Sequence, residues 1–215
     1  MAFGYPVSLE LADRNAVVIG AGAVAQGKVE PLVEAGAWVT VIATGPRKRL
    51  DRLASDDRIT VLRRTFEPGD LEGAFLCVAH SEEPETRAAI YREGQEHGVL
   101  VNVMDDPPHC DFAAPAVVRR GDLIIAVSTG GRSPALARRL RIDLEERFGP
   151  EWAEMLVVLE RARHLTLPAL PDLGERSRRW ERALDLDEVR DLVRVGRPDE
   201  ARDRLVGRLL QEGAA

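Results

Sequence analysis

The sequence predicts an α/β fold in which a doubly wound parallel sheet is followed by a small ββα segment and a helical C-terminal part. Two observations support this fold class. Short apolar strand patterns alternate with helical patterns through the first half, and the last third is helical and heavily charged. The expected domains are residues 1–113, 114–148 and 149–215.

The first predicted strand, Ala16–Ile19, runs into a glycine turn and then a helix. Gly20 permits the tight turn, Gly22 lets the backbone approach a pyrophosphate, and Ala25 allows the helix to pack closely on the strand. The pyrophosphate would lie at the helix start, where free N–H groups favour an anion. The segment therefore predicts a Rossmann-type dinucleotide site, and the alternative is a glycine-rich turn that binds nothing. The expected cofactor-binding residues here are Gly20, Ala21, Gly22, Ala23, Val24 and Ala25.

Four further strand patterns follow at residues 38–42, 59–62, 74–79 and 99–103, and a helix is expected at 83–97. A doubly wound sheet binds its ligand outside the carboxyl ends of its strands. The loops that follow the strands ending at Ile19, Ile42, Ala79 and Val103 should therefore face the site. The expected cofactor neighbours at these strand ends are Thr44, Ala79, His80 and Val103.

The pattern then changes to a hairpin, with strands at 116–118 and 123–127, and a helix at 134–148. This helix carries an apolar residue at every fourth position: Leu136, Leu140, Leu144 and Phe148. A ββα unit of this size cannot form a core of its own, so its apolar surface needs a partner. Beyond it we expect a small helical domain whose last helix covers residues 199–211.

The loop between hairpin and helix, residues 128–134, has two interpretations. Ser133 suits the N-cap and Pro134 the first helical position, so the loop could serve only to start the helix. Its free N–H groups, its hydroxyls and the Arg132 guanidinium could instead bind an anion.

The last strand of the predicted sheet ends in a polar turn that contains Asp105 and Asp106. Asp105 falls where such a sheet places its ligand, close to the expected nicotinamide end of the cofactor. A carboxylate there could accept a proton while hydride leaves to the cofactor. Because Asp-Pro sequences favour turns, a capping role is the alternative.

Composition argues against several classes of function. A net charge of −6 and a pI near 5.4 make nucleic acid or an anionic membrane an unsuitable main partner. No stretch is long and apolar enough to cross a bilayer, and the first residues lack a signal-peptide pattern. Cys77 and Cys110 are too few for a disulfide framework, and Cys77 fits a buried strand. We therefore expect a cytoplasmic protein.

Four segments together resemble one family, the precorrin-2 dehydrogenases, which include the N-terminal module of siroheme synthases. The segments are GAGAVA (20–25), NVMDDP (102–107), CDFAAPAVVRRGDL (110–123) and STGGRSPALARRLR (128–141). The resemblance implies oxidation of precorrin-2 to sirohydrochlorin with NAD. It also implies a homodimer built through the ββα dimerisation segment. Some members further insert Fe²⁺ or Co²⁺ into the product, which makes ferrochelatase activity a second hypothesis with Fe²⁺ as a substrate.

The resemblance also implies roles for single residues. Asp105 matches the family's general base, which is also linked to metal insertion, and Asn102 matches an asparagine near the cofactor. The residues matching the loop that shapes the tetrapyrrole site are Ser128, Thr129, Gly130, Gly131, Arg132, Ser133 and Pro134. Precorrin-2 is a polycarboxylate, so arginines are its expected counter-charges. The candidates are Arg119, Arg120, Arg132 and Arg138.

Departures from the family pattern affect the cofactor. His80 and Ser81 stand where the family usually has Thr and Asp or Asn, and Thr86 replaces an asparagine of the next helix. The second strand ends at Thr44 without the acid that usually holds the adenosine ribose. The basic run at 47–49 could meet a 2′-phosphate, so NAD is favoured and NADP stays open.

No resident metal site is expected, because no cluster has the ligand count of a stable site. His109 and Cys110 follow Asp105 and could escort a divalent ion. Two other functions stay open: an NAD(H)-sensing Rossmann module without catalysis, and an oxidoreductase for another polyanionic substrate. The 128–134 loop favours an enzyme, because a sensor has no need for a second anion-binding loop.

Overall fold

The computed structural model describes residues 3–20, 23–45 and 51–211, without the side chains of residues 23–26. The predictions for Ala21 and Gly22 and for the basic run at 47–49 lie outside the described residues, as do those for the side chains of Ala23, Val24 and Ala25. The chain forms two compact units, Met1–Ala114 and Pro115–Ala215.

The first unit is built on a five-stranded parallel sheet with the strand order β3-β2-β1-β4-β5. Its elements are β1 (Asn15–Ile19), α1 (Ala23–Glu34), β2 (Trp38–Ile42), β3 (Ile59–Leu62), β4 (Leu76–Ala79), α3 (Pro84–His97), β5 (Leu100–Val103) and the short 3₁₀ helix η1 (Pro107–His109). The chain order reverses between β1 and β4, which creates a topological switch point at the carboxyl ends of these strands. The predicted doubly wound sheet is confirmed.

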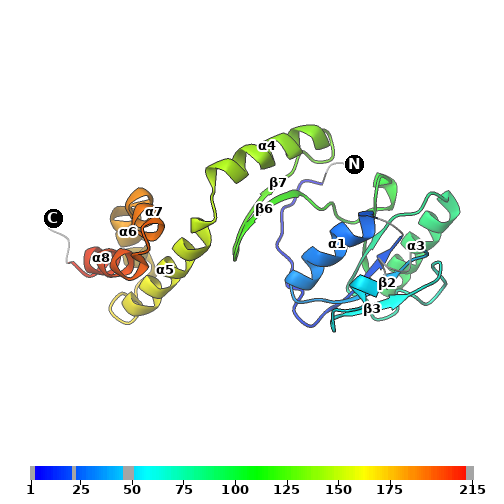
Figure 1. Ribbon diagram of the computed structural model, residues 1–215, viewed down its shortest axis with the longest axis horizontal. Coiled ribbons are helices and arrows are strands. Elements are labelled where there is room, and N and C mark those ends of the chain that lie inside the picture. Colours follow the sequence, from blue (N-terminus) through cyan, green and yellow to red (C-terminus); the bar gives the residue numbers. More distant parts are fainter. Residues whose placement is uncertain (1–2, 21–22, 46–50, 212–215) are drawn as a thin grey trace. The chain divides into compact units, whose positions relative to one another are not determined.

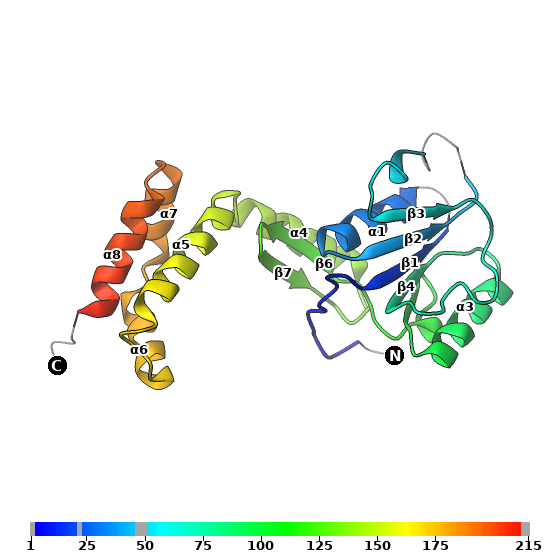
Figure 2. The same cartoon turned by 90° about the horizontal axis from the view of Figure 1, so that it is seen from below.

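Helices α1 and α3 cover opposite faces of this sheet (Figure 2). Val18 of β1 packs in the same buried cluster as Val29 of α1. The preceding residue, Val17, packs in the same cluster as Ile90 of α3. Successive side chains of a strand point to opposite faces, so each strand contributes to both clusters. This double burial explains why the strands read as continuous apolar runs.

Several element boundaries differ by one or two residues from the sequence-based expectation, and two of these differences have a clear local cause. The strand expected from residue 74 begins at Leu76, because Ala74 closes a turn by donating its N–H to the carbonyl of Leu71. The helix expected from residue 83 begins at Pro84, which takes the first helical position after the N-cap residue Glu83.

Both cysteines are free and buried. Cys77 is fully buried in β4, where desolvation raises the pKa of its thiol and the Glu93 carboxylate adds to the effect. Its expected role as a small hydrophobic core residue is confirmed. The cytoplasmic location stays a prediction. Within the described residues, no helix combines the length and the hydrophobicity that a membrane span requires.

The second unit joins a hairpin, one helix beside it and a bundle of four helices (Figure 1). Its elements are β6 (Ala116–Arg120), β7 (Leu123–Val127), α4 (Pro134–Arg147), α5 (Glu151–Thr166), α6 (Leu173–Ala183), α7 (Leu186–Arg194) and α8 (Pro198–Leu210). Strands β6 and β7 pair antiparallel, and α4 packs on both of them. The bundle core contains Met155 of α5 and Leu205 of α8, both almost completely buried.

Arg120 connects the hairpin to the end of α4. Its Nε donates to the carbonyl of Phe148 at 2.7 Å, and its Nη2 donates to the carbonyl of Glu145 at 3.1 Å. These carbonyls lie where a helix leaves its last acceptors unpaired, so the guanidinium acts as a C-terminal cap. The expectation that Arg120 is a counter-charge for substrate is therefore at odds with the structure, which uses this guanidinium inside the fold.

Candidate functional site

The carboxyl ends of the central strands meet at one edge of the sheet, as predicted. Backbone hydrogen bonds connect each departing loop to the last residue of a neighbouring strand. They run from Gly20 N to Ile42 O at 3.0 Å, from His80 N to Ile19 O at 2.8 Å, and from Met104 N to Ala79 O at 2.8 Å. The loops after β1, β4 and β5 therefore start side by side. Ala79 and Val103 are buried beneath them, while Thr44 is exposed after β2.

Gly20 is the first residue of the turn that follows β1. Its φ of +128° is a backbone conformation that residues with a side chain rarely adopt. A Cβ at this position would lie 2.8 Å from the carbonyl oxygen of His80, closer than real Cβ atoms approach a heavy atom. The absence of a side chain here lets the loop after β4 approach the turn after β1 closely. The geometry fits the tight turn with which a dinucleotide-binding loop begins.

Asp105 occupies the turn after β5 and is exposed. Its φ is +61°, in the left-handed region, where aspartate is one of the few tolerated residues with a side chain. The turn is closed by a hydrogen bond from Asp106 N to Val103 O at 3.2 Å. Strained residues of this kind cluster at functional sites. The carboxylate thus lies at the edge where the sheet would present it to a ligand.

A network that sequence reasoning missed surrounds this turn. The Asp106 carboxylate receives Arg87 Nε at 2.7 Å and lies 3.0 Å from His109 Nδ1. Hydrogen bonds from His109 and Arg87 lower the pKa of Asp106, with burial opposing them. Arg87 lies on α3, distant in sequence from the Asp106 turn, so no local pattern indicates the pair.

Asn102 has a structural role that the sequence did not indicate. Its Nδ2 donates to the carbonyl of Phe112 at 2.7 Å, so its amide holds the segment that follows η1. Asp111, in the same segment, accepts a hydrogen bond from Val101 N at 2.9 Å. Together these contacts attach the segment to β5 and support the Asp105 turn. A contact between Asn102 and the cofactor stays a prediction.

The loop at 128–134 belongs to the second unit, and its hydroxyls serve the helix start. Ser133 caps α4 by accepting Leu136 N at 3.3 Å, and Thr129 Oγ1 accepts Ser133 N at 3.1 Å. Ser128 Oγ accepts Gly130 N at 3.2 Å. Gly130 and Gly131 both have positive φ, and Arg132 and Pro134 are exposed. The helix-start interpretation is confirmed, and anion binding stays a prediction.

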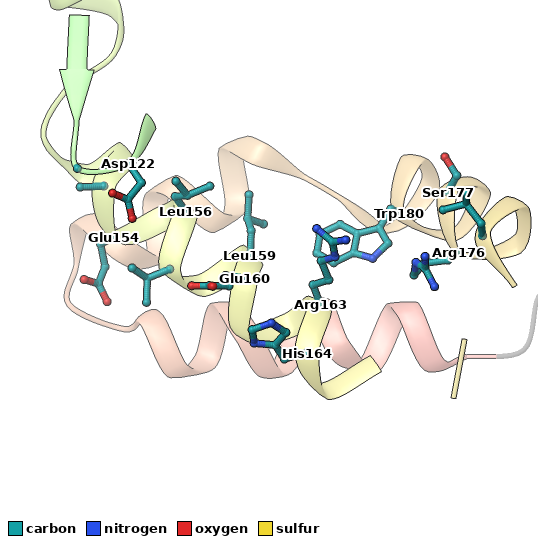
Figure 3. Close-up of a pocket in the computed structure, with 14 residues that line it drawn as sticks. Asp122, Glu154, Leu156, Leu159, Glu160, Arg163, His164, Arg176, Ser177 and Trp180 are labelled. Carbon is teal, nitrogen blue, oxygen red and sulfur yellow. The ribbon is translucent and has the colours of Figure 1, made fainter. Parts of the chain in front are cut away.

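Among the described residues, no group of three His, Cys, Asp or Glu side chains is arranged to hold a metal ion. A cavity of about 800 Å³ lies along α5 and α6 in the second unit (Figure 3). Leu156, Leu159 and Trp180 line it together with Arg163 and Arg176. None of its lining residues was predicted to bind cofactor or substrate.

Two family models match the chain. One, described as "Putative NAD(P)-binding", covers residues 7–116, more than half of the chain. The other, described as "Sirohaem biosynthesis protein central", covers residues 120–147, which include β7 and α4.

Known proteins resemble the chain over nearly its whole length. The siroheme synthases of Methylococcus capsulatus and Pseudomonas aeruginosa are each 35% identical to it, over 196 and 210 residues. These alignments cover 91% and 98% of this chain but 41% and 45% of the relatives, so the chain spans less than half of their length. The solved structure of SirC, precorrin-2 dehydrogenase, matches with a TM-score of 0.72 at 22% identity, covering 94% of this chain and 98% of that one. The likeness to this structure confirms the fold.

Proposed function

Since the chain belongs to the NAD(P)-binding family matched over residues 7–116, we propose that it is an NAD-dependent dehydrogenase that oxidises precorrin-2 to sirohydrochlorin. The observation that carries this proposal is the placement of two features at one edge of the sheet. Gly20 forms the tight turn with which a dinucleotide-binding loop begins, and Asp105 presents a carboxylate from a strained turn. The siroheme synthase relatives and the central sirohaem model support the substrate class.

The chemistry requires removal of two hydrogens from precorrin-2. Bound NAD would accept one of these hydrogens as a hydride. The other leaves as a proton, and the Asp105 carboxylate, exposed at the turn, accepts it. Arg132 and Arg138 are exposed in the second unit and stay the candidate counter-charges for a polycarboxylate.

An anaerobic absorbance assay with enzymatically generated precorrin-2 tests the proposal. We expect the sirohydrochlorin spectrum to appear with NAD⁺, and more slowly with NADP⁺. Fe²⁺ or Co²⁺ added afterwards tests ferrochelatase activity, which requires a metal-dependent spectral change above the spontaneous rate. Dinucleotide binding without any turnover would instead favour the NAD(H)-sensing module.

We also propose that the chain acts as a homodimer through its ββα segment. Leu136 and Leu140 of α4 are 50% and 40% exposed, and Ile124 on the outer face of the hairpin is 46% exposed. A two-stranded sheet is marginally stable without further packing, and apolar surface of this kind marks an interaction site. A second copy presents the same apolar surface and can cover it.

Leu140→Glu is expected to weaken the dimer by at least ~10-fold, because burying an unpaired carboxylate costs several kcal/mol. Sedimentation velocity over a concentration series measures the change. Leu210→Glu, at a leucine of α8 with 42% exposure, is the matched control and should leave the dimer intact. Equal sedimentation of the wild type and both variants would remove α4 from the interface.

A further inference from the structure

Arg87 joins two loops of the candidate site. Its Nε contacts the Asp106 carboxylate after β5, at 2.7 Å. Its Nη1 donates to the carbonyls of Ser81 and Glu82 after β4, at 3.0 Å each. One guanidinium thus holds the two loops in a fixed relation, which a planar group with several donors does well.

The ion pair of Arg87 and Asp106 is only partly accessible. The exposed fraction is 24% for the Arg87 side chain and 16% for that of Asp106, so water screens the pair less than a surface pair. His109 completes the cluster from the other side, with Nδ1 3.0 Å from the same Asp106 oxygen and its ring in edge contact with Tyr91. The cluster is therefore held from α3 and from η1 at once.

The cluster bears directly on Asp105. Asp105 precedes Asp106 in the chain, and its left-handed conformation persists only if its surroundings hold it there. On the other side, the carbonyl of His80 lies against Gly20, so the loop that Arg87 holds also borders the dinucleotide turn. If either loop shifts, the distance between the Asp105 carboxylate and the dinucleotide turn changes.

We propose that Arg87 and Asp106 are positioning residues of this site: they fix the Asp105 turn against the loop after β4, and Arg87 neutralises the charge next to Asp105. The inference rests on the proposed function, in which Asp105 accepts the proton. Neither residue touches the reacting atoms in this assignment. They act by fixing the position of the Asp105 carboxylate and by setting the electrostatic potential around it.

The charge balance around Asp105 predicts opposite effects from two substitutions. The titratable and charged groups of the surrounding elements include Arg87 and Tyr91 of α3, His80, Glu82 and Glu83 after β4, Asp106 and His109 in its own turn, and Cys110 and Asp111 beyond η1. Arg87→Gln removes the permanent cation beside Asp106 and leaves His109 as its partner, which disfavours a second negative charge next to Asp106. Asp106→Asn removes a negative charge and leaves the Arg87 cation in place.

The test is the pH profile of kcat/KM in the precorrin-2 assay, whose acid limb reports the essential base of the free enzyme. We expect Arg87→Gln to move the acid limb upward by about one pH unit and Asp106→Asn to move it downward. The double variant should lie near the wild type. We also expect Arg87→Gln to lower kcat by ~10-fold or more with little change in NADH affinity, since misplaced groups lose rate before binding.

Arg92→Gln is the control, at an exposed arginine of the same helix, and should leave both profile and rate unchanged. The positioning role would be overturned if the acid limb of the kcat/KM profile lay at the same pH in all variants. It would also be overturned if Arg87→Gln and Asp106→Asn shifted that limb in the same direction. A general loss of folding differs from positioning, because it reduces kcat and the thermal midpoint without opposite pH shifts. If the wild type shows no turnover, the proposed function and this inference are overturned together. If the wild type turns over precorrin-2 but neither substitution moves the acid limb, the inference alone is overturned.

Discussion

Asp105→Asn should reduce kcat for precorrin-2 oxidation roughly 10²–10⁴-fold, the usual contribution of a general base. Asparagine has nearly the same shape as aspartate and also tolerates a left-handed backbone, so the turn with φ +61° should survive. The variant removes the proton acceptor and little else. Single-turnover absorbance at saturating NAD⁺ measures the chemical step, and NADH fluorescence should show unchanged dinucleotide affinity.

Asp13→Asn is the matched control for this change. Asp13 is exposed and has a φ of +58°, but it precedes β1 and therefore lies at the amino end of the sheet. The two substitutions carry the same chemical change in the same backbone conformation, so a difference between them comes from position. Turnover of Asp105→Asn within a factor of about two of Asp13→Asn would remove Asp105 as the base, since a general base contributes far more.

The parts of the fold that follow local rules could be predicted from the sequence. Strands such as residues 38–42 and 59–62 are short apolar runs between helical patterns, and their alternation determines a doubly wound sheet. The switch point then places the loops after Ile19, Ala79 and Val103 at one edge. The exposed leucines of α4 were also expected, because a ββα segment of that size cannot bury its own apolar stripe.

The parts that depend on contacts between distant residues could not be predicted. Arg87 looks like an ordinary charged residue of an amphipathic helix, and only the fold brings it to Asp106. Arg120 looked available to a polyanion, but its guanidinium caps α4. A sequence shows which groups can form hydrogen bonds, whereas the tertiary structure decides which partners they find.

Gly20→Ala is expected to lower NADH affinity by at least ~100-fold, because the turn after β1 must shift away from the loop after β4 and lose the conformation that a dinucleotide-binding loop requires. The added Cβ would lie 2.8 Å from a backbone oxygen of His80, which cannot move aside as a flexible side chain would. Strain from the φ of +128° adds a loss of folding stability of about 1–3 kcal/mol. Titration of NADH fluorescence and urea unfolding measure the two effects separately.

Gly69→Ala separates the effect of backbone strain from the effect of the clash with the loop after β4. Gly69 has a φ of +97°, but a Cβ there meets no atom within 4 Å, and its turn leads into the amino end of β4. Both variants should be less stable than the wild type, and only Gly20→Ala should lose affinity for NADH. If Gly20→Ala bound NADH as tightly as Gly69→Ala at the same folded fraction, the glycine turn after β1 would be a structural feature that binds nothing. The proposed dehydrogenase would then have no cofactor site at this turn, whether or not Asp105 acts as the base.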